Sequence, residues 1–487
     1  MRVAIIKPPE SDLQDRFSRE HTYEPLGIAY LAAFLREEGI EVQLIDSHIE
    51  RLSSEQVDAR LRKFGPDLIG FTVFTQCRFP SYELIQFVGQ RWPKTPIVVG
   101  GPHPSTCAQD MLEHFPEIDY VVRSEGELAL LDLCRVVEGK GDPGSVDSLS
   151  YRDGDRILHN PTKRVIHDLD VLPLPARDLL SMNLYRGNLR TDLNPHIKER
   201  ALGIITSRGC PIGCYYCSST RIEGRWRGHS PDRVLDEFKL LIDRYKVRDF
   251  FIWDDAFTLN IDRAREILTR MIDEQLNVRY AVHSRSKNLD QDLVYLLKES
   301  GCVELRVGCE SGSSKILEQI TRPRKQFVEE IFQVAVWCEN AGLPTHLSFI
   351  VSHPEETDLE VQQTLDVMRR LKKYKMVNVQ FNVMHIYPGT RIEEYARAKG
   401  ILPKDFSWSK RHDDLEMMTA FNSEVPVYLE HFDMKDIYGY LAEWSKLNSE
   451  RVWENVPQII RNIRKPRDVV RLLEMTNAYA RRLLSRA

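Results

Sequence analysis

The first 140 residues alternate short apolar runs with amphipathic stretches. The apolar runs are RVAIIKPP, EVQLIDS, DLIGFTVF, PIVVGG and DYVVRSEGE, and stretches such as LGIAYLAAFLREEG and SYELIQFVGQRW lie between them. Strands that alternate with helices, with glycine or serine after the strands, are typical of an open and mostly parallel sheet with helices on both faces. We therefore predict a Rossmann-like, doubly wound α/β domain over residues 1–140, with a ligand site beyond the carboxyl ends of its strands.

The pattern changes twice more along the chain. Residues 141–199 are rich in glycine, proline and aspartate and lack a sustained period, which predicts a linker. Residues 200–395 contain six further strand-like runs separated by helical stretches, and this predicts a partial (β/α)6 TIM-like barrel with its chemistry at the carboxyl ends of the strands. Residues 396–487 are predicted to be mostly helical, with two amphipathic helices near the end.

The composition narrows the class of protein. The 487 residues are 42% hydrophobic and 29% charged, as in a globular protein of two or three domains. A net charge of −5 gives no electrostatic reason to expect nucleic acid or an anionic membrane as a partner. No apolar run approaches the ~20 residues of a membrane helix, and the N-terminus lacks a secretory signal pattern, so we expect no transmembrane segment and a cytoplasmic location.

Three of the nine cysteines are clustered. Six are scattered and are predicted to be buried small hydrophobic residues, whereas RGCPIGCYYCSS holds Cys210, Cys214 and Cys217 in a C-x3-C-x2-C pattern directly after the apolar run LGIITS. The three cannot form a set of structural disulfides, but they can converge on one metal centre. A structural zinc site needs four protein ligands, and no second C-x2-C or nearby pair of histidines completes one. Thiolates favour iron–sulfur clusters, and three of them on a four-iron cubane leave one iron open for an exogenous ligand.

This loop resembles that of the radical S-adenosylmethionine (SAM) superfamily, which also has an aromatic residue before the last cysteine, here Tyr216. The resemblance implies a [4Fe-4S] cluster whose open iron chelates SAM, and an electron transfer that cleaves SAM to a 5'-deoxyadenosyl radical. It also implies an external electron donor such as flavodoxin or ferredoxin. Further matches follow the predicted strands FIWDD, HSR, VGCE and HIYPGT, and the SAM contacts that they imply are Asp254, Asp255, Arg285, Glu310, His385 and Tyr387.

Some of these residues have simpler interpretations. Asp254 and Asp255 could cap the next helix, and Arg285 could form an ordinary surface salt bridge. One segment departs from the family pattern, because many relatives read G-x-P-G-E-T where this chain has SHPEET, with Ser352, His353 and Glu355 in place of small residues. We prefer to interpret His353 as a solvent-exposed turn histidine, and a substrate contact specific to this enzyme is the alternative.

The N-terminal region resembles the cobalamin-binding domain of the cobalamin-dependent radical SAM branch. The D-x-H-x-x-G motif that supplies a histidine to cobalt is absent, and His48 is not assigned as a ligand because it follows the second strand and lacks the glycine. The domain could bind the corrin without a protein ligand on cobalt, or it could be only structural. The cobalamin contacts that the resemblance implies are Pro25, Leu26, Gly27, Thr72, Thr75, Gln76, Gly100, Gly101, Glu125 and Gly126.

The leading hypothesis is a cobalamin-dependent radical SAM enzyme that methylates an sp3 carbon, or a phosphinate phosphorus, of a small biosynthetic intermediate. A radical enzyme without methyl transfer, which catalyses dehydration, epimerisation, cyclisation or rearrangement, is the alternative. A cobalamin-responsive or iron–sulfur interaction module is a third hypothesis. The stretch FSWSKRHDDLEMM could cover the barrel mouth through Trp408, His412, Asp413 and Asp414, although we prefer to interpret it as a solvated connecting loop.

Overall fold

The computed structural model describes residues 1–10, 22–320, 326–412, 415 and 425–446. The chain divides into two compact units, Met1–Phe432 and Asp433–Ala487. In the second unit, residues 434–446 are helical, and the two amphipathic helices predicted near the C-terminus lie outside the described residues. No helix in the described part of the chain has the length and apolar character that crossing a membrane requires.

The first unit begins with a seven-stranded sheet in the order β2-β1-β3-β4-β5-β6-β7. Its five parallel strands are the five predicted runs, and a hairpin, β6 and β7, continues the sheet antiparallel beyond β5. The strands are β1 (Arg2–Lys7), β2 (Glu41–Asp46), β3 (Leu68–Thr72), β4 (Ile97–Gly100), β5 (Tyr120–Val122), β6 (Leu149–Asp153) and β7 (Arg156–His159). The interval predicted as a linker therefore contains two strands of this sheet.

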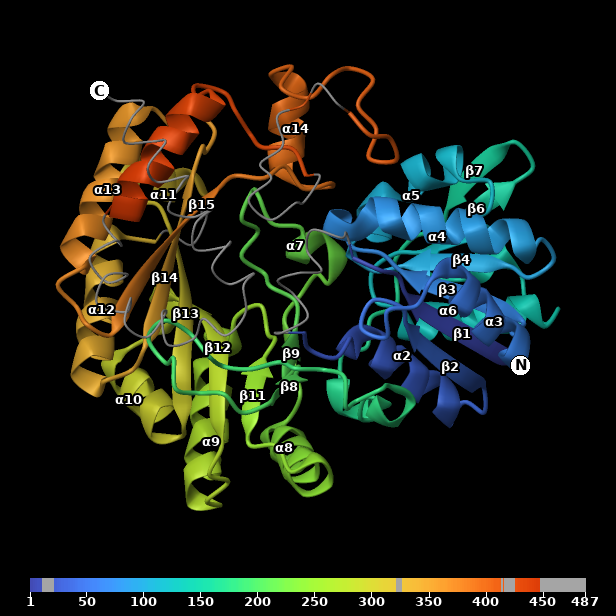
Figure 1. The fold of residues 1–487 in the computed structure, drawn as a ribbon, viewed down its shortest axis with the longest axis horizontal. Helices are drawn as coiled ribbons and strands as arrows, with labels where there is room; N and C mark the ends of the chain where they lie inside the picture. Colours follow the sequence, from blue (N-terminus) through green and yellow to red (C-terminus); the bar gives the residue numbers. More distant parts are fainter. Residues whose placement is uncertain (11–21, 321–325, 413–414, 416–424, 447–487) are drawn as a thin grey trace, which may run out of the picture. The chain divides into compact units, whose positions relative to one another are not determined.

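Helices cover both faces of the first sheet (Figure 1). Alternate residues of β1 enter different cores, because Val3 and Ile5 pack with α2 and α6 whereas Ala4 and Ile6 pack with α3, α4 and α5. The helices are α2 (Leu26–Glu37), α3 (Ser54–Phe64), α4 (Arg78–Arg91), α5 (Pro102–His114) and α6 (Glu127–Val137). A strand whose central residues are all apolar, as Val3–Ile6 are in RVAIIK, is the expected sequence for a sheet buried on both faces.

The second sheet has six strands, all parallel, in the order β15-β14-β13-β12-β11-β8. Figure 1 shows α9, α10, α12 and α13 along its outer side. The strands are β8 (Ala201–Ile204), β11 (Asp249–Ile252), β12 (Arg279–Arg285), β13 (Cys302–Glu310), β14 (Thr345–Val351) and β15 (Val377–Val383). The α-helices are α8 (Pro231–Tyr245), α9 (Ile261–Asp273), α10 (Gln291–Glu299), α11 (Ser314–Ile320), α12 (Val328–Ala341), α13 (Asp358–Leu371) and α14 (Arg391–Ala398).

Buried ion pairs join elements of the two sheets within the first unit. Arg177 is 3% exposed and binds Glu24 at 3.1 Å and Glu237 at 2.8 Å, and its guanidinium also donates to the carbonyl of Gly203 at 2.7 Å. Because a buried charge is costly unless it is paired and hydrogen-bonded, these contacts fix the segment around Arg177 between α2 and α8.

The described part of the stretch around Trp408 is not the solvated loop that we had expected. Trp408 is 3% exposed and packs in the core that α3, α4 and α5 form on the first sheet. Its carbonyl accepts a hydrogen bond from the buried Arg78 at 3.0 Å, and His412 stacks on Phe406 with ring centroids 4.7 Å apart. Asp413 and Asp414 lie outside the described residues.

Candidate active site

The cysteine loop follows β8 and is held by a buried carboxylate. Asp254, which is 1% exposed, accepts hydrogen bonds of 2.6 to 3.0 Å from the backbone amides and hydroxyls of Thr206 and Ser207. Gly209, two residues after Ser207, has a φ of +81°, and its amide donates to Glu223 at 2.6 Å. A β-carbon at Gly209 would lie 2.6 Å from the carbonyl oxygen of Arg225, so this turn requires glycine. The loop is therefore fixed before its first cysteine.

The three cysteines of this loop remain free thiols. Cys210 and Cys214 are half-buried and Cys217 is exposed. Burial raises the pKa of all three, and for Cys214 to about 12, while the nearby charge of Arg285 lowers the pKa of Cys210 and Cys214. Three soft sulfur ligands on one accessible loop fit three irons of a cubane, and iron binding would stabilise the thiolates against this effect of burial.

Tyr216, Arg285 and Glu310 lie together beside the cysteines. The Tyr216 hydroxyl hydrogen-bonds to the Glu310 carboxylate, and Arg285 is close enough to interact with that carboxylate. Burial raises the pKa of Glu310 to about 7, against the effects of Tyr216 and Arg285. Glu310 also has a φ of +66° at the end of β13, a conformation that side chains other than glycine rarely adopt. Strained backbone of this kind concentrates at functional sites.

The two aspartates after β11 have different surroundings. Asp254 has both carboxylate oxygens occupied by the cysteine loop, so its observed contacts position the loop. Asp255 is exposed and accepts a hydrogen bond from Ser219, two residues after Cys217, at 3.1 Å. The predicted SAM contact of either aspartate stays a prediction, and the geometry leaves Asp255 the more available of the two.

His353 is buried, so the interpretation as an exposed turn histidine was wrong. It is 1% exposed, its Nδ1 atom hydrogen-bonds to the Tyr215 hydroxyl, and burial lowers its pKa to about 4. Its ring also lies near the backbone of Glu310. Tyr215 precedes Tyr216 in the cysteine loop, so His353 links that loop to the ends of β13 and β14.

The turn that carries His353 keeps a glycine-like backbone without glycine. Ser352 and Glu355 have φ values of +73° and +59°. The buried carboxylate of Glu356 accepts hydrogen bonds from the amides of Ser352 at 2.7 Å and His353 at 3.0 Å. These bonds hold the strained turn. No motif in the sequence indicates that Tyr215, His353 and Glu356 lie together.

The two remaining SAM predictions lie after β15. His385 is half-buried, with Nδ1 3.4 Å from the carbonyl of Val425. The Tyr387 hydroxyl accepts a hydrogen bond from Gln76 of the first sheet at 3.0 Å. Tyr387 and Gln76 line a cavity of about 150 Å³ together with Thr75, Thr106 and Ser218, the residue after Cys217. Elements after β3 and β15 therefore meet next to the cysteine loop.

Most other residues predicted to contact cobalamin are engaged within the protein. Glu125 binds Arg208 and Arg227, and the Thr75 hydroxyl lies 3.1 Å from Nδ1 of the buried His103. Leu26 is buried at the start of α2, whose first residue follows Pro25. Two of the four glycines are tightly packed: a β-carbon at Gly101 would lie 2.9 Å from the Thr72 hydroxyl, and one at Gly126 would lie 3.0 Å from Leu31. The other two have room, because a β-carbon at Gly100 would lie 3.6 Å from Val122 and one at Gly27 would have no atom within 4 Å.

His48 is likewise engaged. Its ring is 2% exposed and its Nδ1 accepts a hydrogen bond from the Glu10 amide at 3.3 Å. The structure thus places His48 in a local contact at the end of β2.

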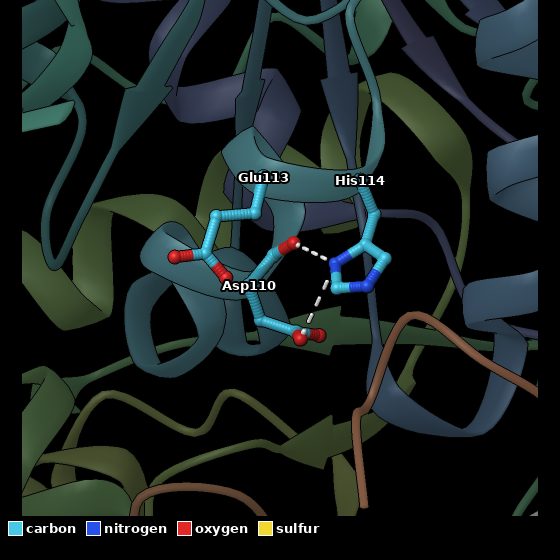
Figure 2. Close-up of side chains that lie close together, drawn as sticks. All are labelled: Asp110, Glu113 and His114. Carbon is cyan, nitrogen blue, oxygen red and sulfur yellow. Dashed lines mark hydrogen bonds and ion pairs between the residues drawn. The ribbon is translucent and has the colours of Figure 1, made fainter. Parts of the chain in front are cut away.

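A second cluster of potential metal ligands lies on α5. Figure 2 shows Asp110, Glu113 and His114 close together. Their ligand atoms lie within 4.8 Å of one another, and no other group in the described part of the chain is this close. The Asp110 carboxylate already accepts hydrogen bonds from the hydroxyls of Ser407 and Ser409, each at 2.7 Å. The cluster therefore attaches the stretch around Trp408 to α5, and we assign it no metal.

Comparisons with known proteins agree with this arrangement. Residues 16–133 match the family model of the B12 binding domain, and residues 204–368 match that of the radical SAM superfamily. The chain is 33% identical over 428 residues to the uncharacterized methyltransferase PH0819 of Pyrococcus horikoshii, covering 87% of this chain and 89% of that protein. It is 25% identical over 354 residues to the anaerobic magnesium-protoporphyrin IX monomethyl ester cyclase of Rubrivivax gelatinosus, covering 71% of this chain and 62% of that protein.

A solved structure shares the fold. The radical SAM methyltransferase TsrM of Kitasatospora setae, determined with cobalamin and a [4Fe-4S] cluster bound, superposes with a TM-score of 0.70 at 18% identity and covers 92% of this chain and 88% of that one. The chain therefore belongs to the radical SAM superfamily, in the cobalamin-dependent methyltransferase family that joins a B12-binding domain to a radical SAM core.

Proposed function

We propose that this protein binds a [4Fe-4S] cluster, SAM and cobalamin and methylates an unactivated carbon of a small biosynthetic intermediate. One observation supports this most directly: Cys210, Cys214 and Cys217 lie beside Tyr216, Arg285 and Glu310 at the carboxyl ends of a parallel sheet. Three thiols, a guanidinium and a carboxylate are the groups needed to hold an iron cluster and the charged ends of an amino acid.

The chain's residues would have separate roles in holding the cofactors. The three cysteines would bind the cluster, Arg285 would pair with the SAM carboxylate, and Glu310 or Asp255 would accept hydrogen bonds from its amine or ribose. Asp254 and His353 would keep the loop and the strand ends in place. When bound, the cluster supplies the electron that converts SAM to a 5'-deoxyadenosyl radical, and the corrinoid supplies the methyl group.

The corrinoid would lie over the carboxyl ends of the first sheet. β2 and β3 flank β1 in this sheet, and ligands of doubly wound sheets bind where the strand order reverses in this way. The cavity beside Gln76 and Tyr387 measures about 150 Å³, whereas drug-sized ligands fill roughly 300–1,000 Å³, so it can hold only part of a corrin. The amide of Gln76 and the hydroxyl of Tyr387 can hydrogen-bond to corrin side chains, and the rest of the ring would extend over neighbouring strand ends.

Isotope labelling tests the methyl transfer. The reconstituted protein is incubated anaerobically with a reductant and with SAM carrying a 13C label on its methyl group, and the products are followed by mass spectrometry. We expect the label in the product. An unlabelled product formed together with 5'-deoxyadenosine would reject methyl transfer and retain the radical chemistry.

The second candidate is a radical SAM enzyme that does not methylate its substrate. The resemblance to a magnesium-protoporphyrin cyclase favours it, because that relative is named for a cyclisation and not for a methyl transfer. The same labelling experiment separates the two functions.

Several finer assignments belong to this proposal. We place domain boundaries near residues 199 and 395, and we move the first boundary from residue 140 to beyond β7, because β6 and β7 belong to the first sheet. We treat the first sheet as Rossmann-like and the second as a partial (β/α)6 barrel. We also propose a cytoplasmic enzyme that takes its electron from a flavodoxin or ferredoxin.

A further inference from the structure

The two faces of the second sheet differ sharply in chemistry. On β13, β14 and β15 the residues directed to the helices are apolar and buried, and Leu305, Leu347 and Phe349 are all 0% exposed. The alternate residues point to the opposite face, and most of them are polar. They are Glu304, Arg306, His346, Ser348, Asn378, Gln380 and Asn382.

Strand register arranges these side chains in rows. Arg285, Gly308, Ser348 and Gln380 form one row across β12 to β15. The next row, further from the carboxyl ends, contains His283, Arg306, His346 and Asn378. Adjacent strands lie about 4.8 Å apart, so Ser348 is roughly 10 Å from Arg285 across the same face. A group held at Arg285 and a second molecule held at Ser348 and Gln380 would be neighbours.

The polar residues form a connected network. The Ser348 hydroxyl donates to Gln380 Oε1 at 3.2 Å, and Gln380 Nε2 lies 3.2 Å from His346 Nδ1. His346 Nε2 lies 3.5 Å from Glu304, and Glu304 also binds Arg306 at 2.7 Å. The network therefore fixes the orientation of the Gln380 amide at a position that remains exposed.

The network has unused hydrogen-bonding capacity. Glu304 is 1% exposed and His346 5% exposed, yet Glu304 Oε2 and His346 Nε2 have no hydrogen-bond partner among the described residues, since the 3.5 Å contact between the two side chains is not a hydrogen bond. The exposed Gln380 and Asn382 amides and the Arg306 guanidinium, whose side chain is 38% exposed, can bind further groups. The partly exposed ring of Trp253, at 43%, contacts His283 at the edge of the same face.

We propose that this polar face binds the substrate, and that the substrate is a small water-soluble molecule with several hydroxyl, amide or anionic groups. Gln380 and Ser348 would bind it directly, with Arg306 available for an anionic group. An isoprenoid or another lipid would cover these amides and the guanidinium without satisfying their remaining donors and acceptors, at a cost of about 1–3 kcal/mol for each unsatisfied group. The inference rests on the proposed function, because it assumes that SAM occupies the neighbouring residues Arg285 and Glu310.

A partition experiment tests the substrate class. Cells that naturally produce the protein are extracted, and the extract is divided into an aqueous and a chloroform phase. Each phase is incubated with reconstituted protein that forms 5'-deoxyadenosine from methyl-labelled SAM, and mass spectrometry follows every compound that is consumed. We expect consumption from the aqueous phase. Failure to consume any aqueous compound would overturn the proposal, whether or not a lipid is consumed.

Substitutions on the polar face test whether this face binds the compound that is consumed. Gln380→Leu should lower consumption at least tenfold at an unchanged iron content per chain, and Asn382→Leu provides a second variant if the first does not fold. Gln363→Leu, which alters an exposed amide on α13, is the matched control. Wild-type consumption by both Gln380→Leu and Asn382→Leu would also overturn the proposal. Aqueous consumption without transfer of the label would support the substrate class and reject methyl transfer instead.

Discussion

The carboxyl ends of the two parallel sheets differ in how their polar residues are used. At the second sheet, Tyr216, Arg285 and Glu310 gather around three free thiols, and Glu310 has a strained backbone. At the first sheet, Glu125 is paired with two arginines and Thr75 contacts a buried histidine. We call the carboxyl ends of the strands of the first and second sheets the first edge and the second edge. The second edge carries charged side chains and thiols that can bind small charged groups, whereas the first edge offers mostly backbone and a few uncharged side chains such as Gln76.

This difference has a chemical reason. A metal cluster and an amino acid need charged ligands at set positions, so the residues that bind them are of restricted type and spacing. A large uncharged ring can be held by shape and backbone, which restricts side chains much less. Substitutions should therefore abolish function at the second edge and only reduce cofactor binding or stability at the first.

Loss of the cysteines should have the largest effect. Replacing Cys210, Cys214 and Cys217 together by alanine should reduce iron from about four atoms per chain to nearly none, because the thiolates are the ligands of the cluster. Formation of 5'-deoxyadenosine should then be undetectable. Iron analysis and Mössbauer spectroscopy after anaerobic reconstitution measure the change. The control is Cys77→Ala, a half-buried cysteine outside the loop, which should keep both iron and activity.

Arg285→Ala should have the next largest effect, on SAM binding. Loss of a charge-assisted hydrogen bond costs about 1.5–3 kcal/mol, so the Kd for SAM should rise roughly 10- to 100-fold while iron content stays unchanged. Equilibrium dialysis with labelled SAM provides the measurement. Arg306→Ala, four residues before the carboxyl end of β13, is the matched control and should leave the Kd for SAM within about twofold. An unchanged Kd in Arg285→Ala would show that the guanidinium does not hold the SAM carboxylate.

Glu125 separates stability from cofactor binding at the first sheet. Glu125→Ala removes the carboxylate that binds Arg227 and one of the two that bind Arg208, and the side chains of Arg208 and Arg227 are 11% and 6% exposed. Arg208 keeps its ion pair with Glu127 at 2.8 Å. Breaking a fully buried pair costs about 3–5 kcal/mol, and partial exposure here lowers our expectation to about 2 kcal/mol. Urea unfolding measures this loss. Gln76→Ala is the contrasting variant, since it should retain stability and lower bound corrinoid, and the opposite pattern would place Glu125 in the corrin site.

The sequence predicted the parallel strands of both sheets, but it missed the hairpin of β6 and β7 and several contacts at the strand ends. Each parallel strand was visible as an apolar run because both sheets are covered by helices, and RVAIIK is one example. The cysteine loop was visible because its three ligands are close in sequence. Tyr215, His353 and Glu356 come together from distant segments, and the burial of Trp408 depends on contacts with α4 and α5. Sequence periodicity carries no information about such long-range pairs.

The smallest expected effect is on how the free energy of unfolding depends on pH, and its sign is opposite for Glu356 at the second edge and His103 at the first. Burial raises the pKa of Glu356 from 4.5 to about 8, so between these values the folded state holds a proton that the unfolded state releases. Stability contributed by the protonated Glu356 is therefore present below pH 4.5 and is lost as the pH rises towards 8. Burial instead lowers the pKa of His103 well below 6.5, so its contribution is lost as the pH falls below 6.5.

Glu356→Gln tests the first of these effects. A glutamine keeps an oxygen for the amides of Ser352 and His353 but cannot titrate. Between pH 4.5 and pH 8, the wild type should lose stability relative to the variant as the pH rises. The difference between their free energies of unfolding should change by at most about 1.4 kcal/mol per pH unit. Urea unfolding at pH 6 and pH 7 measures that difference, and His103→Gln, which should change the acid side instead, is the comparison. If the difference in unfolding free energy does not vary with pH, Glu356 is ionised in the folded protein. The turn from Ser352 to Glu356 would then contain a buried charge.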